Sequence, residues 1–181
     1  AEFILLDTDS TKEANTHAQH GDGIAATKSH NHFRTVAVAP DAKIMILRIF
    51  DAELEAPDNG SGYVGDDNVA ACIIWGATLG GDGVPNTGDE ADVLNNSWGG
   101  RGYGQVLKEA VDAVTEAGVM FVNSMGNSSS DEALSPKVYP GVMGVGATSP
   151  DDTKTGFSTM GGVISVGAPG DDVLSSVPTW L

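Results

Sequence analysis

The sequence predicts an α/β protein with a doubly wound, mostly parallel sheet and helices on both faces, a three-layer α/β/α arrangement. Short apolar runs, typical of strands that are covered on both faces, alternate along the chain with helical segments. Such alternation favours parallel strands joined by right-handed helical crossovers. No repeat, low-complexity tract or linker interrupts the pattern, so residues 1–181 are expected to form a single domain.

The individual elements follow from local patterns. The clearest helix is 105–117, whose apolar residues recur at helical spacing and which Gly118 ends. A second helix is expected to be capped by Asp66 or Asp67. A third, rich in small residues, is expected over 20–27. Six apolar runs are expected to be strands: 3–6, 43–50, 91–95, 119–122, 142–146 and 163–166.

The amino-acid composition argues against several classes of binding partner. The net charge of -16, from 25 acidic and 9 basic residues, argues against binding to nucleic acid or to an anionic membrane. No apolar run has the length of a membrane span. The single cysteine, Cys72, excludes an internal disulfide and is expected to be a small buried hydrophobe. The chain opens without a basic and apolar leader, so any signal peptide has been removed or was never present.

Metal sites receive weak support from the sequence. The histidines lack a second well-spaced pair of ligands, so a zinc site is not expected. The acidic loop 80–92 carries the oxygen ligands that calcium prefers, but its spacing does not match an EF-hand, which favours a solvated loop. The four histidines are His17, His20, His30 and His32.

Two polar residues follow predicted strands directly. Asn127 lies just beyond the carboxyl end of strand 119–122, where open α/β sheets place their sites. Its amide could donate a hydrogen bond to a developing oxyanion, or it could be an ordinary turn residue. Asp7, after the first strand, is either a turn-former or the residue that orients a catalytic group.

Seven segments, taken in order, resemble the subtilisin-like serine peptidases (subtilases). Each is weak alone, but together they cover nearly the whole chain. The resemblance implies the subtilisin-like version of the three-layer fold. The segments are 20–26 (His-Gly-Asp-Gly-Ile-Ala-Ala), 38–42 (Val-Ala-Pro-Asp-Ala), 94–100 (Leu-Asn-Asn-Ser-Trp-Gly-Gly), 126–127 (Gly-Asn), 139–147 (Tyr-Pro-Gly-Val-Met-Gly-Val-Gly-Ala), 157–159 (Phe-Ser-Thr) and 168–170 (Ala-Pro-Gly).

The resemblance implies a secreted serine endopeptidase that hydrolyses peptide bonds in proteins. His20 would be the general base, Asp7 would orient its imidazole, and Asn127 would be the oxyanion donor. The chemistry needs no cofactor, and the family pattern allows structural calcium whose ligands the sequence does not name. The resemblance also implies a cis bond before Pro136.

The same resemblance places the substrate. Its backbone would add as a strand along Ser97, Trp98 and Gly99. The side chain before the scissile bond would enter a slot with Trp98 and Met125 in its walls, which suggests apolar or aromatic substrate residues. The substrate-binding residues are Ser97, Trp98, Gly99, Gly100, Ser124, Met125 and Gly126.

Departures from the family near its first two motifs leave the orienting carboxylate open. Asp9 replaces a family glycine, and the interval from Asp7 to His20 is short, so either a loop is missing or Asp9 orients the base. Gly23 stands where the family has a second histidine, and Ala26 replaces a closing glycine.

The third departure concerns the nucleophile. The family's Gly-Thr-Ser-Met-Ala motif is absent from this chain, and Ser158 lies in a segment that matches a non-catalytic stretch. The nucleophilic serine is therefore expected to lie in a missing carboxyl-terminal segment, which would be a partner of this chain. This chain alone is expected to be inactive. Without that segment, apolar surface on the sheet is expected to be exposed. The alternative is a non-catalytic domain that binds peptides or proteins by edge-strand addition.

Overall fold

The computed structural model describes residues 2–8, 16–28, 36–50, 62–132 and 134–176, without the side chains of residues 2–16 and 18. Within these residues six parallel strands form one sheet in the order β2-β1-β3-β4-β5-β6, which confirms the predicted fold class. In chain order the elements are β1 (Glu2–Thr8), α1 (Thr16–Ala26), β2 (Lys43–Phe50), α2 (Asp66–Thr78), β3 (Val93–Asn96), α3 (Gln105–Glu116), β4 (Met120–Ser124), β5 (Val142–Thr148) and β6 (Ile164–Pro169).

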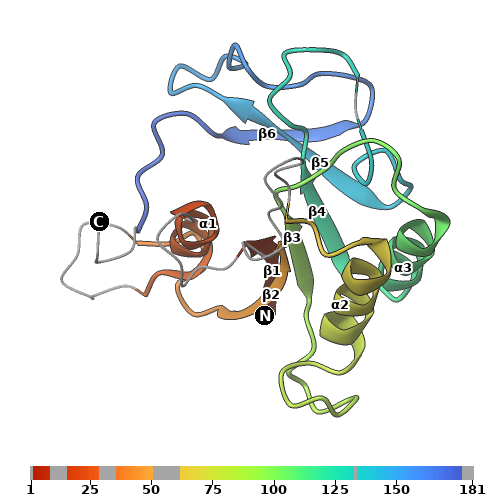
Figure 1. The fold of residues 1–181 in the computed structure, drawn as a ribbon. Helices are drawn as coiled ribbons and strands as arrows, with labels where there is room; N and C mark the ends of the chain where they lie inside the picture. Colours follow the sequence, from red (N-terminus) through yellow and green to blue (C-terminus); the bar gives the residue numbers. More distant parts are fainter. Residues whose placement is uncertain (1, 9–15, 29–35, 51–61, 133, 177–181) are drawn as a thin grey trace.

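Helices lie on both faces of the sheet (Figure 1). Helix α1 packs on one face against β1 and β2, whereas α2 and α3 pack against each other on the opposite face. The carboxyl ends of the parallel strands therefore meet at one edge, beside the start of α1.

The hydrophobic core lies between the sheet and the pair α2 and α3. Phe121 on β4, Leu94 on β3 and Ile49 on β2 are fully buried against this layer. Ile73 of α2 and Val111 of α3 face them and are equally buried. This burial fixes the central strands whose ends carry the candidate site.

Helix α3 matches its prediction closely. Its apolar stripe is buried, Lys108 and Asp112 form an ion pair one turn apart, and Ala117 is the C-cap. Gly118 follows with φ +92°, the left-handed conformation that glycine adopts readily at a helix end.

The predicted cap of α2 is wrong. Gly65 is the N-cap, and neither aspartate makes a side-chain cap. The Asp66 carboxylate instead accepts hydrogen bonds from the Tyr63 hydroxyl, at 2.9 Å, and from the Gly104 backbone N–H before α3. The carboxylate thus joins two segments rather than satisfying its own helix.

Helix α1 begins earlier than expected. The pattern predicted a start at His20, whereas the structure starts the helix at Thr16. His20 consequently lies inside the second turn of α1, with two glycines following it in the same helix.

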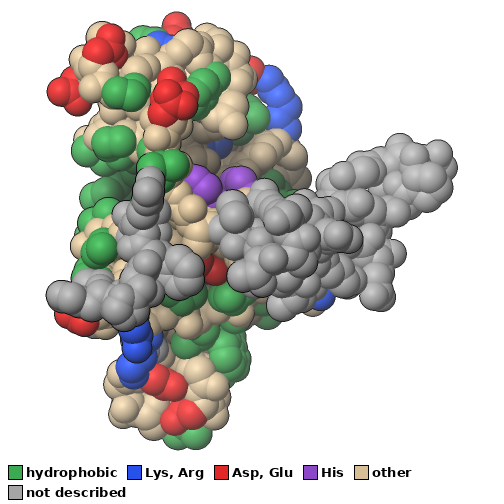
Figure 2. Space-filling model, turned by 90° about the vertical axis from the view of Figure 1, so that its left-hand side faces the viewer, with side chains coloured by type: hydrophobic (Ala, Val, Ile, Leu, Met, Phe, Trp, Pro, Cys, Tyr) green, Lys and Arg blue, Asp and Glu red, His purple; other side chains and the backbone are tan. Residues whose placement is uncertain are grey.

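The face of the sheet that carries α1 is only partly covered. Side chains alternate along β4, so Phe121 is buried while Met120, on the opposite face, is 47% exposed. The expectation that 119–122 is covered on both faces is therefore wrong at Met120. Val166 of β6, the register partner of Val145, is exposed on the same face, which agrees with the expected apolar surface. Ile164 is exposed on the face of Phe121. Figure 2 looks onto this face and shows hydrophobic side chains along it, with histidine near the middle.

Two predictions from composition can be compared with the described residues. Cys72 is half-buried on α2, and this burial raises the pKa of its thiol. No helix in the described ranges is both long and apolar enough to cross a membrane.

Candidate active site

The predicted site residues gather at the carboxyl-terminal edge of the sheet. Strand β1 lies beside β3, and β3 lies beside β4, so the ends of these strands are adjacent. Asp7 is the next-to-last residue of β1, Ser97 directly follows β3, and Asn127 follows β4. The side chain of Asp7 and all of Asp9 lie outside the described residues, so their predicted hydrogen bond to His20 stays a prediction.

His20 is held on α1 by the segment 173–176, which follows β6. Its Nε2–H donates to the Val173 carbonyl at 3.0 Å. The Ser175 hydroxyl donates to the His20 carbonyl at 2.6 Å, and the Ser176 hydroxyl donates to that of Gln19 at 3.2 Å. In this arrangement the ring nitrogen that would receive a proton already carries one, so general-base action requires the contact with Val173 to open.

Gly23 allows the segment 173–176 to lie against the helix. A Cβ at Gly23 would lie 2.2 Å from Ser175 Oγ, 2.3 Å from Ser176 Oγ and 2.8 Å from the Ser176 backbone nitrogen. The histidine that the subtilase pattern has at this position would not fit in this structure. Glycine, although unfavourable inside a helix, is here the residue that permits the contact.

We expect Gly23→Ala to displace the segment and release the imidazole. The new methyl group overlaps backbone as well as hydroxyl atoms, so rotation of the serine side chains alone does not relieve it. The expected result is a shifted ¹⁵N NMR resonance for Nε2 of His20, because its hydrogen bond to Val173 is lost.

Gly162→Ala is the matched control, because nothing lies within 4 Å of a Cβ at Gly162. It should leave the His20 resonance where it is. An unchanged resonance in Gly23→Ala would show that this helix does not depend on glycine for its contact with 173–176.

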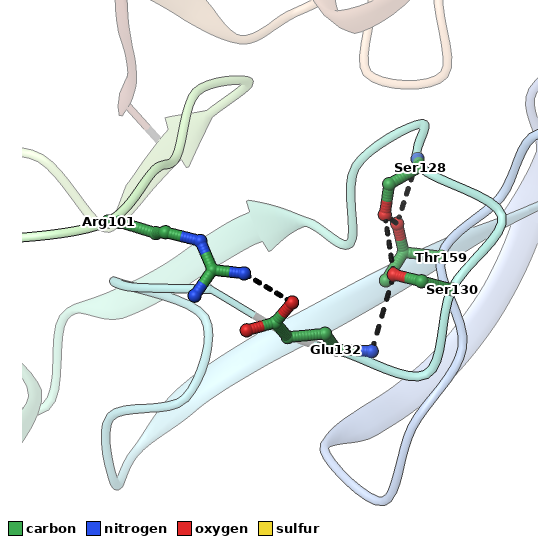
Figure 3. A network of polar contacts seen from close by, with 5 residues as sticks. All are labelled: Arg101, Ser128, Ser130, Glu132 and Thr159. Atoms are coloured by element: carbon green, nitrogen blue, oxygen red, sulfur yellow. Dashed lines mark hydrogen bonds and ion pairs between the residues drawn. The ribbon is translucent and has the colours of Figure 1, made fainter.

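Hydrogen bonds with Thr159 hold the turn that carries Asn127. Gly126 has φ +94°, a conformation that glycine adopts readily, and its carbonyl accepts the Thr159 backbone N–H at 2.9 Å. The buried Thr159 hydroxyl accepts the Ser128 N–H at 3.1 Å and lies 2.9 Å from the Ser128 hydroxyl, which in turn lies 2.8 Å from that of Ser130 (Figure 3). The backbone on both sides of Asn127 is therefore anchored.

The Asn127 side chain itself is exposed and makes no hydrogen bond with the described residues. Its amide differs in this respect from those of Asn96 and Asn123, which are buried and donate to backbone carbonyls. An oxyanion donor needs such an arrangement. The N–H groups of the amide are free to donate, and the backbone that carries the amide is already fixed.

Those two buried asparagines join the ends of β3 and β4. Nδ2 of Asn123 donates to the carbonyls of Asn96 and Trp98, both at 2.8 Å. Asn96 in turn donates to the Val122 carbonyl at 3.1 Å and accepts the indole N–H of Trp98 at 3.0 Å. This network fixes the stretch that was predicted to pair with a substrate backbone.

A pocket of about 280 Å³ opens between the two strand ends. Trp98 and Met125 line the pocket, and both are almost wholly buried. Gly100, the remaining predicted substrate-binding residue, lies beside the pocket, where its N–H donates to the Ser135 carbonyl at 3.0 Å. The predicted residues that line the pocket are Ser97, Trp98, Gly99, Ser124, Met125, Gly126 and Asn127.

The sequence profile of the Subtilase family (Peptidase S8) matches residues 6–180. The chain belongs to the subtilase family. The family resemblance predicted from the sequence is thus confirmed, and the pocket lies between the two segments that carried much of it.

The sequence is also similar to individual named proteases. The chain is 43% identical to fervidolysin of Fervidobacterium pennivorans over 181 residues, covering 98% of this chain and 24% of that protein. It is 31% identical to thermitase of Thermoactinomyces vulgaris over 177 residues, covering 97% of this chain and 57% of thermitase. The chain therefore spans less than two thirds of either subtilase.

Solved structures confirm the subtilisin-like fold. The crystal structure of fervidolysin, described as a keratinolytic enzyme related to subtilisin, superposes with a TM-score of 0.77 at 35% identity over 98% of this chain and 29% of that one. The protease domain of PatA superposes with a TM-score of 0.74 at 22% identity, covering 99% of this chain and 63% of that one, a likeness of fold alone. The Ser135–Pro136 peptide bond is cis, as the subtilase resemblance predicted.

The subtilase pocket contains two charged residues that the sequence reading missed. Glu132 lines it and forms an ion pair with Arg101 (Figure 3). Lys137 also lines it and is almost fully buried, and burial lowers the pKa of its ammonium group. Nothing in the sequence indicated this lysine, because the segment that carries Lys137 was not predicted to line the pocket.

Ser158 does not take the place of the nucleophile in this structure. It is buried, and its hydroxyl accepts the Ala147 N–H at 3.0 Å. Its backbone N–H is bound to the Thr155 hydroxyl at 3.2 Å. The rejection of Ser158 as nucleophile agrees with this structural role.

The acidic loop 80–92 uses carboxylates to bind its own backbone. Asp89 accepts the Asp82 N–H at 2.9 Å, and Glu90 accepts the N–H groups of Thr87 and Gly88 at 3.0 and 2.9 Å. Hydrogen bonds, first from the Thr87 hydroxyl, lower the pKa of Asp89. No cluster of three or more His, Cys, Asp or Glu suited to a metal occurs within the described residues, and His30 and His32 lie outside them.

Proposed function

We propose that the protein containing this chain is a secreted serine endopeptidase. Membership of the subtilase family and similarity to named proteases support proteolysis in general. One relative, from Dichelobacter nodosus, is named an extracellular basic protease, which favours secretion. The observation that carries the proposal is the anchored turn that presents the free Asn127 amide beside a substrate-sized pocket.

In the proposed reaction a serine hydroxyl attacks the scissile carbonyl. Nε2 of His20, freed from Val173, takes the proton from the serine and later gives it to the leaving amine. Asp7, or Asp9 in its place, stabilises the imidazolium and holds its orientation. The carbon–nitrogen bond breaks in the second step, and water then hydrolyses the acyl-enzyme.

The carbonyl oxygen becomes negative when the serine attacks. The Asn127 amide would donate to that oxygen, and the fixed turn means that little reorganisation is needed at that moment. Ser97 and Gly99 would receive the substrate backbone as an added strand, with Ser124 and Gly126 on the other side of the side-chain pocket. This chemistry requires no cofactor, and the partner is a protein or peptide.

The nucleophile would come from a segment outside these 181 residues. The partly covered face of the sheet supports this view, because Met120 and Val166 offer apolar surface on which a further helix could pack. A hollow of about 300 Å³ at the ends of β3 to β6 lies next to Ser97 and Ser124. Calcium, if bound, would have a structural role only.

A second candidate is a non-catalytic subtilase-like domain that binds peptides by edge-strand addition. One observation favours it: the Val173 carbonyl accepts a hydrogen bond from the ring nitrogen of His20 that a general base would need free. Such a domain would keep the strand-binding stretch and the pocket without needing a free base.

The experiment that separates the two is intact mass spectrometry of the protein expressed from its complete gene, before and after a fluorophosphonate probe. An endopeptidase should gain the mass of one adduct and lose the ability to gain it when His20 is replaced by alanine. A protein that takes no adduct but still binds peptides would establish the second candidate instead.

A further inference from the structure

Lys137 forms part of the wall of the substrate pocket. Its side chain is only 4% exposed, and its Nζ atom lies 2.6 Å from the position that a Cβ of Gly99 would occupy. Gly99 lines the same pocket and was predicted to receive the substrate backbone. The ammonium group therefore lies directly behind the strand along which a substrate would add.

This ammonium group has no hydrogen-bond or ion-pair partner among the described residues. Buried charges in proteins are normally paired, because removing a charge from water without a partner is costly. The depressed pKa of Lys137 has this cause. An anion that enters the pocket would therefore gain an ion pair with the Lys137 ammonium group.

Glu132 does not neutralise Lys137. Its carboxylate pairs with Arg101 at the surface, where the two side chains are 55% and 70% exposed (Figure 3). Exposed charges are screened by water and salt, whereas buried charges are screened much less. The deep part of the pocket is therefore positive within a chain whose net charge is -16.

We propose that this pocket selects a substrate whose residue before the scissile bond carries a carboxylate, glutamate or aspartate. The inference rests on the proposed function, since it names the substrate class of that same site. The carboxylate would enter between Gly99 and Gly126 and pair with the Nζ ammonium of Lys137. The glycines leave room for the side chain, and the lysine supplies the charge.

This differs from the apolar or aromatic preference expected from Trp98 and Met125. Both side chains line the pocket beside Lys137, so its walls are apolar around one ammonium group. Such walls suit the methylene groups of a glutamate side chain while the ammonium pairs with its carboxylate. An aromatic ring in the pocket would leave the Lys137 ammonium desolvated and unpaired, which penalises the apolar ligand.

The test compares peptides that differ only in the residue before the scissile bond: glutamate, its neutral isostere glutamine, and phenylalanine. With the protein from its complete gene, kcat/KM should be about 10- to 100-fold higher for glutamate than for glutamine. Lys137→Met, which keeps length and removes charge, should reduce that ratio to about one. Lys28→Met removes an exposed lysine elsewhere and should leave it unchanged.

Glu132→Gln provides a second variant at an exposed position that does not threaten folding. It should raise the preference for glutamate, because one negative charge leaves the mouth of the pocket. A preference for phenylalanine in the unmodified protein, or a glutamate preference that survives Lys137→Met, would overturn the inference while leaving the peptidase proposal intact.

A binding measurement covers the case in which nothing is cleaved. Fluorescence anisotropy of labelled peptide amides that end in glutamate or glutamine reports the pocket without catalysis. Tighter binding of the glutamate peptide that disappears in Lys137→Met supports the inference even if the protein fails the fluorophosphonate test. Equal binding of the two peptides in an inert protein overturns both the peptidase proposal and the charge selection.

Discussion

Replacement of Phe121 by alanine is expected to lower the free energy of unfolding by about 3–5 kcal/mol. Phe121 lies on β4, at the centre of the sheet, and is fully buried against α2 and α3. Neighbouring strands hold the backbone on both sides, so the cavity cannot close by local collapse. Urea denaturation of the 181-residue chain, followed by tryptophan fluorescence, measures the change.

Met120→Ala is the matched control on the same strand. Met120 is adjacent in sequence, points to the other face and is about half exposed, so its truncation should cost about 1 kcal/mol or less. Equal losses for the two variants would mean that the layer of α2 and α3 does not form the main core. The slope of the unfolding free energy against urea should stay the same in both.

Replacement of Asn127 by leucine is expected to lower kcat by about 10- to 150-fold with little change in KM. The expectation follows from the proposed function, in which the amide donates to oxygen only when it becomes negative. A hydrogen bond to a charged group contributes about 1.5–3 kcal/mol, and an interaction made only in the transition state appears in kcat. Leucine keeps the size of the side chain and removes the donor.

Steady-state kinetics on the protein from its complete gene would measure this effect, with Asn68→Leu as control. Asn68 donates to the Val64 carbonyl at the start of α2, away from the pocket, and its loss should leave kcat unchanged. Thr159→Val removes the hydroxyl that holds the turn and should lower kcat less than Asn127→Leu does. A rise in KM with constant kcat in Asn127→Leu would assign the amide to ground-state binding instead.

Local patterns in the sequence predicted the features that neighbouring residues determine. The 3.6-residue periodicity of 105–117 and the glycine that follows it specify α3 without any knowledge of the rest of the chain. The family motifs around His20 and Asn127 are likewise continuous, so the sequence alone was enough to predict a role for both residues.

Features that depend on distant segments could not be predicted in this way. Ser128 and Thr159 are 31 residues apart, and Asn123 reaches the Asn96 carbonyl across 27 residues. Their pairing requires the strand register, which the sequence pattern does not specify. The sequence carries no signal for Lys137, because its burial depends on packing against distant segments such as the one that contains Gly99.

The hydrogen bond from the Ser128 N–H to Thr159 also affects the rate at which Asn127 can deamidate. Asparagine is thermolabile, and an Asn-Ser sequence deamidates when the following backbone nitrogen attacks the side-chain carbonyl. At Asn127 that nitrogen belongs to Ser128 and is held by the Thr159 hydroxyl at 3.1 Å, in a turn whose backbone is anchored on both sides. The contact that anchors this turn is therefore expected to slow the conversion of the Asn127 amide to an acid as well.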